Sequence, residues 1–278
     1  MGEHTAQSYV FIPQRPTSKR PRLFVPDSID TILDALDQVL AESRRRRSRR
    51  GYFAALYRDV TARVKAAIEA GEFEDGARME RLDVQFAQRY LDALDSRGTE
   101  PGPPRAWART FAAAERWRPL ILQHLLLGMN AHINLDLGIA AVEVADEDSL
   151  PDLKADFDHI NDILGAMIES VQVRLTRVSP WIGVLDRVGG HADEAISNFG
   201  LIHARTDAWA FAQTLAPLAS DERASAIAAK DRETAARTDP ILRPGGPWAL
   251  PALFWIRVWE TKSVPTVLST LSRTSPAV

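Results

Sequence analysis

Residues 119–144 read PLILQHLLLGMNAHINLDLGIAAVEV, and this segment is apolar on nearly all sides apart from a sparse polar series. A helix that is apolar around its whole circumference is buried among others, whereas a surface helix has a single apolar stripe. The sequence therefore predicts a central helix over about residues 119–142. Because Gln123, His124, Asn130 and Asp136 interrupt the apolar residues, no run of about 18 forms, and we expect no membrane span.

The flanking segments carry amphipathic helical patterns, in which apolar residues recur at spacings of three and four. These patterns cover residues 29–40, 52–70, 75–96, 153–176, 181–188, 192–218 and 221–238, with others near Trp107 and after Pro247. No useful alternating strand pattern, repeat or phosphate-binding glycine loop occurs in the sequence. We therefore predict an all-α fold, with one compact multi-helix domain over residues 27–278.

The first 26 residues differ from the rest, because four prolines space them and favour an extended arm. The arm lacks the apolar stretch of a signal peptide, so we expect a cytoplasmic protein. The 34 basic and 37 acidic residues give a net charge of -3, which predicts no general attraction to nucleic acid. Cysteine is absent, which excludes disulfides and thiolate chemistry. The sequence is compatible with a homo-oligomer.

The best candidate site lies on the central helix, where His132 and Asp136 are four residues apart and share a face. The carboxylate would orient the imidazole as a general base, or both side chains would ligate one metal ion. The alternative is a contact that merely satisfies two polar groups in a core helix. Gly128, one turn before His132, indicates the close approach of another backbone or a ligand.

Other polar residues extend this candidate site. Asn130 and Asn134 would bind substrate or form an interhelical hydrogen-bond network. Arg205 would bind a carboxylate, from Asp136 or from a ligand, or make a structural ion pair.

A metal site would need further ligands. His124 shares the face of His132, and Asp158 and Asp162 lie in a second polar cluster that would complete the site if it packed nearby. Zinc is the first choice for His and Asp ligands, another divalent ion the second. The Glu-x-x-His repeats of di-iron bundles are missing. Our main expectation is a site without a cofactor.

Several motifs resemble one known family, the largely bacterial proteins grouped as domain of unknown function 5995. They are GYFAALY (51–57), FAQRY (86–90) and, most specifically, LGMNAHINLDL (127–137), followed by later matches around residues 156–164 and 205–209. The resemblance covers most of the chain and implies a helical fold. It draws attention to Asn130, His132, Asp136, Asn161 and Arg205, but the family carries no established activity. His124 and His159 do not correspond to its pattern.

We therefore expect a small-molecule enzyme, of the kind found in secondary metabolism, with His132 as general acid or base and Asp136 as its orienting group. Hydrolysis, cyclisation or isomerisation would suit such a site. The residues expected to hold a polar group of the substrate are Asn130, Asn134, Asn161 and Arg205. A metal-dependent hydrolase is the other enzymatic interpretation. The competing hypothesis is a ligand-binding or protein-interaction domain whose polar helix is structural.

Overall fold

The computed structural model describes residues 27–181, 198–245 and 249–272. The predicted N-terminal arm and the helix predicted at 181–188 lie almost wholly outside these residues, as does the start of the 192–218 pattern. The described residues form helices and no strand, which confirms the all-α prediction. Their bounds are α1 Ile29–Arg46, α2 Gly51–Glu69, α3 Gly76–Asp95, α4 Arg105–Ala114, α5 Ile121–Ala131, η1 His132–Leu137, α6 Gly138–Val144, η2 Pro151–Leu153, α7 Lys154–Val178, α10 Asn198–Leu215, α11 Ser220–Ala236, α12 Thr238–Leu242, α13 Ala249–Trp259 and α14 Val264–Leu271.

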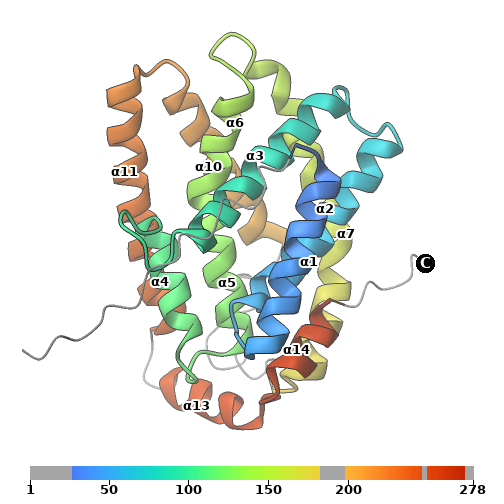
Figure 1. The fold of residues 1–278 in the computed structure, drawn as a ribbon, viewed down its shortest axis with the longest axis vertical. Coiled ribbons are helices and arrows are strands. Elements are labelled where there is room, and N and C mark those ends of the chain that lie inside the picture. The colour runs from blue at the N-terminus through green and yellow to red at the C-terminus, as the bar shows by residue number, and fades with distance from the viewer. Residues whose placement is uncertain (1–26, 182–197, 246–248, 273–278) are drawn as a thin grey trace, which may run out of the picture.

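The centre of the fold is a rod made of α5, η1 and α6, here called the central rod. Figure 1 shows α4 and α11 on one side of it and α1, α2 and α7 on the other. Leu127, Ala131 and Leu135 within the rod are at most 1% exposed. By length and composition, Ile121–Val144 would pass for a membrane span, but 78% of its apolar window is buried inside the protein. The predicted central helix is therefore confirmed as a core helix.

The central rod is not one continuous α-helix, because residues His132–Leu137 form a π-helix between α5 and α6. Such wide turns are rare and occur frequently at functional sites. This one contains both His132 and Asp136. At its end, a Cβ added to Gly138 would lie 2.6 Å from the carbonyl oxygen of Ala208, so the glycine permits α10 to approach the rod closely.

Buried charged groups join the outer helices to one another and to the start of the central rod. Arg174 of α7 donates from Nη2 to Oδ2 of Asp59 in α2 at 2.8 Å, and from Nη1 to the carbonyl of Leu271 in α14 at 2.8 Å. Glu260 accepts from the backbone N–H of Ile121 at 3.1 Å, which satisfies a free donor at the start of α5. These contacts fix three sequence-distant helices and the entry to the central rod.

Candidate functional site

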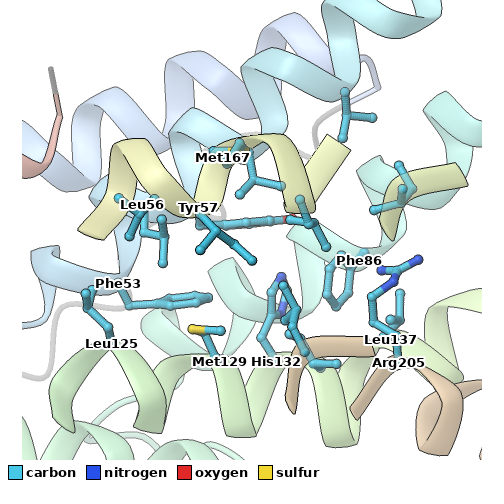
Figure 2. A pocket seen from close by; sticks show the side chains of 18 of the residues that line it. Phe53, Leu56, Tyr57, Phe86, Leu125, Met129, His132, Leu137, Met167 and Arg205 are labelled. Carbon is cyan, nitrogen blue, oxygen red and sulfur yellow. The ribbon is translucent and has the colours of Figure 1, made fainter. Parts of the chain in front are cut away.

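A cavity of about 140 Å³ lies beside the central rod, between α2, α3, α5, α7 and α10. Most of its lining is aliphatic, aromatic or methionine side chains, and Figure 2 shows many of these directed into it. Its polar lining residues are Tyr57, Asp83, His132 and Arg205. An engineered apolar cavity of about 150 Å³ binds benzene, so this one is large enough for a small apolar molecule.

His132 stands on the wall of this cavity with only 2% of its surface exposed. Its Nδ1 atom lies 3.2 Å from Oδ2 of Asp136. The imidazole stacks on the Phe86 ring, with centroids 3.5 Å apart, and meets the Tyr57 ring at 75° with centroids 4.5 Å apart (Figure 2). The other nitrogen, Nε2, is buried and has no hydrogen-bond partner among the described residues.

Asp136 is anchored from three sides. Besides contacting His132, it accepts from Nε1 of Trp107 at 2.8 Å and from Nε of Arg89 at 3.4 Å. Trp107 and Arg89 can only donate, so we assign the contact with Asp136 to an Nδ1–H donor of neutral His132, which leaves the lone pair on Nε2. Burial lowers the pKa of His132, and the hydrogen bond to Asp136 opposes that effect. The arrangement thus holds a neutral imidazole against a carboxylate that fixes its orientation.

This pair was predicted from the sequence, but the residues that support it were not. Arg89 and Phe86 lie in the FAQRY segment that carries the family resemblance, so a signal for them was present. For Trp107 the sequence contained no signal beyond the apolar character of the residue. Asp83, the carboxyl on the cavity wall, was also missed, although it follows Met79 by four residues and precedes Phe86 by three. That spacing places a charged residue type on the apolar face of α3.

Asn130 and Asn134 face α11 and do not line the cavity. Asn130 donates to the carbonyl of Thr234 at 3.0 Å, and Asn134 donates to Oδ1 of Asn130 at 3.1 Å. Arg237 donates to Oδ1 of Asn134 at 3.1 Å. These contacts match the alternative offered by the sequence, an interhelical hydrogen-bond network.

Arg205 does line the cavity, from α10. Its Nε donates to Oδ1 of Asn161 at 2.7 Å, a second Arg205 nitrogen donates to the carbonyl of Phe157, and the guanidinium lies 4.4 Å from the centroid of the Phe157 ring. Burial lowers its pKa to about 10. Arg205 forms no ion pair with any described carboxylate, and the arginine that pairs with the Asp136 carboxylate is Arg89 instead.

The structure does not bring the further metal ligands to the His132–Asp136 pair. Asp158 pairs with Lys154, and the side chain of Asp162 is 83% exposed beside His159, because this face of α7 points to solvent. His124 packs on the Tyr52 ring and lines a separate small cavity. Over residues 27–181, 198–245 and 249–272, no group of three or more His, Asp or Glu side chains is placed to hold a metal ion.

Gly128 also differs from expectation. The group that approaches it is neither a backbone nor a ligand but the Phe53 ring, whose Cγ would lie 2.3 Å from an added Cβ. The glycine therefore makes room for an aromatic ring of the cavity wall, since Phe53 lines the cavity and contacts His132 with centroids 5.6 Å apart.

Comparison with known proteins gives one match. A family model described as "Family of unknown function (DUF5995)" matches residues 29–244, a range that contains the whole central rod, the cavity lining and Arg205. No curated protein and no solved structure matches the chain.

Proposed function

The chain belongs to the DUF5995 family of unknown function, and we propose that it is an enzyme that binds a small apolar substrate in the cavity and moves a proton with His132. One observation carries the proposal. The buried Nε2 of His132 has no partner, while Nδ1 is held by a carboxylate. Buried polar atoms are almost always hydrogen-bonded. A buried basic nitrogen that lacks a protein partner and lies beside a cavity is therefore suited to bind a group of a substrate.

The chemistry follows from the two nitrogens. Nε2 takes a proton from the substrate, Nδ1–H keeps its hydrogen bond to Asp136, and the carboxylate stabilises the imidazolium that forms. The same nitrogen then returns the proton at a second position. Hydrolysis would need a water held in the cavity beside the substrate. Isomerisation or cyclisation moves the proton without a second reactant, and we favour these two reactions for that reason.

The imidazole is enclosed by the Tyr57 and Phe86 rings (Figure 2). Since Nε2 is itself covered, a shift of a neighbouring side chain must uncover it when substrate binds. Ring and rotamer motions of this kind are ordinary at ligand sites, where interface side chains change rotamer without backbone movement.

The test begins with the compound that the purified protein carries. We would extract wild-type protein, His132→Gln and the cavity-filling variant Met129→Trp with organic solvent, and identify bound molecules by mass spectrometry. The expected result is a bound apolar compound in wild type, its unconverted precursor in His132→Gln, and neither in Met129→Trp. The same compound in wild type and His132→Gln would contradict a role for His132 in catalysis.

A second candidate is a binding protein without enzymatic activity, in which the polar helix is structural. One observation favours it, because Asp136 has its three donors without any ligand. This candidate predicts that His132→Gln carries the same compound as wild type and is less stable. Folding stability and bound compound together distinguish the two.

A further inference from the structure

Two more buried polar atoms of the cavity lack partners. The hydroxyl oxygen of Tyr57 and Oδ2 of Asp83 are buried and belong to lining residues. Neither has a hydrogen bond of good geometry with a described residue, and the one hydroxyl that interacts with Tyr57 is that of Thr61. A buried polar atom without a hydrogen bond destabilises a protein, so such atoms are rare and usually have a functional or structural reason. Two such atoms on one cavity wall indicate that a bound molecule supplies their partner.

These two side chains belong to the same corner of the cavity as His132. Tyr57 contacts the imidazole directly, with ring centroids 4.5 Å apart. Asp83 lies one helical turn before Phe86, whose ring stacks on the imidazole. Tyr57 and Asp83 both line this cavity, from α2 and α3.

Both groups are hydrogen-bond donors at neutral pH. Asp83 forms no ion pair with a described residue, and burial, with a smaller contribution from Glu80, raises its pKa to about 7. A large share of Asp83 therefore keeps its proton. Burial holds the pKa of Tyr57 well above its usual value, so the phenol stays protonated. Two neutral donors in apolar surroundings suit an acceptor that is uncharged before reaction and gains negative charge during it.

We propose that Tyr57 and neutral Asp83 bind the oxygen of an uncharged, apolar carbonyl compound, and that His132 removes a proton from the carbon beside that carbonyl. The inference rests on the proposed function and names its substrate class. The C–H bond breaks and its proton moves to Nε2 of His132. The electron pair forms a C=C bond, and the carbonyl π pair moves to the oxygen, where the two donors stabilise it. The imidazolium then returns the proton to carbon, so no oxidant or reductant is required.

Arg205 supports a different ligand. Its buried guanidinium lines the same cavity without a carboxylate partner, and it would take an anionic head group. Arg205 already has three hydrogen-bonding or ring contacts, to Asn161 and Phe157. Oδ2 of Asp83 has no partner, and the Tyr57 hydroxyl has only the Thr61 hydroxyl beside it. We therefore favour the uncharged ligand and make the anion an outcome of the test.

The test uses three probes of nearly equal shape: acetophenone, ethylbenzene and benzoate. Dissociation constants would be measured by NMR titration with the full chain, in wild type, Tyr57→Phe, Asp83→Leu and Asp83→Asn. Because the wall donors are unpaired when no oxygen is present, wild type is expected to prefer acetophenone over ethylbenzene by about tenfold or more. Tyr57→Phe and Asp83→Leu should lose most of that preference, and Asp83→Asn, whose amide still donates, should keep it.

A second measurement follows the chemistry. In D₂O, wild type should exchange the methyl protons of acetophenone for deuterium, and Asp83→Leu should slow this exchange by roughly a hundredfold. His132→Gln should abolish exchange but retain the preference for acetophenone. Tyr57→Phe removes one hydroxyl, whose neighbour is the Thr61 hydroxyl, so it is expected to fold with a nearly unchanged melting temperature and keeps the test interpretable.

The remaining outcomes separate the two proposals. Equal binding of acetophenone and ethylbenzene in every variant would overturn the oxygen subsite and leave an apolar cavity that binds ligands. Tightest binding of benzoate, lost in Arg205→Met and kept in Asp83→Leu, would overturn it in favour of an anion site. Binding of none of the three probes would refute the proposed function itself.

Discussion

His132 contacts Asp136 within a π-helical turn, with Nδ1 and Oδ2 3.2 Å apart, while Trp107 and Arg89 hold the carboxylate from outside the central rod. We expect the neutral imidazole to carry its proton on Nδ1. In ¹⁵N NMR, Nδ1 should show the shift of a protonated ring nitrogen and Nε2 that of a bare one. Asp136→Asn should redistribute the proton, because its amide donates as well as accepts. A proton found on Nε2 in wild type would rule out this base.

Asp83 should make stability depend on pH. Its pKa is about 7 in the folded protein and near its ordinary value of about 3.9 when unfolded. Between these values the folded state binds the additional proton, so the free energy of unfolding falls as pH rises, by up to about 1.4 kcal/mol per unit. Urea unfolding at pH 5 and pH 8 should show a stability advantage for Asp83→Asn that grows with pH. A constant difference between the two proteins would contradict a buried neutral carboxyl.

His124 should act in the opposite direction. Burial, with the charges of Arg49 and Arg257, lowers its pKa to about 3. Below about pH 6.5 the unfolded chain gains a proton that the folded protein does not accept, so stability falls as pH decreases. His124→Gln should lose less stability than wild type between pH 7 and pH 5, as measured by urea unfolding. Parallel losses in both proteins would show that His124 does not contribute.

Gly128→Ala should disturb the cavity through Phe53. The added Cβ would lie 2.3 Å from Cγ of the ring, so the ring must move. Overpacking of this kind reduces stability by about 1–3 kcal/mol. Thermal or urea unfolding measures the loss, and the expected accompanying change is weaker ligand binding. Gly102→Ala is the control, since the added Cβ there would meet only the carbonyl of Thr99, at 3.7 Å.

Asn130 should contribute to stability and not to binding. Its side chain joins the central rod to α11 through the carbonyl of Thr234 and through Asn134. Asn130→Leu leaves these buried groups unpaired, and we expect a loss of about 1–3 kcal/mol with unchanged affinity for the carried compound. If a folded Asn130→Leu protein binds the compound more weakly, Asn130 contributes to ligand binding and the prediction is wrong.

The sequence predicted the helices well, because apolar residues repeat at helical spacing over long segments. It also located His132 and Asp136 on the central helix. It did not predict the π-helix, since one widened turn changes the spacing of too few residues to alter a periodic pattern. Spacing along one helix does not encode how helices pack. It therefore did not predict which acceptors Arg205 would bind, that Asp158 would face solvent, or that Trp107 would donate to Asp136.

The widened turn also divides the central rod into two halves that belong to different neighbours. α5 packs on α2 and α4, whereas α6 packs on α3 and α10. In a continuous α-helix each residue turns the next by about 100°. A π-helix takes more residues per turn than an α-helix, so removing one residue from His132–Leu137 would let the central rod continue as an α-helix, with α6 still facing α3 and α10. Such a deletion should therefore keep the helix packing and shift His132 relative to Asp136, so it should disturb the candidate site more than the fold.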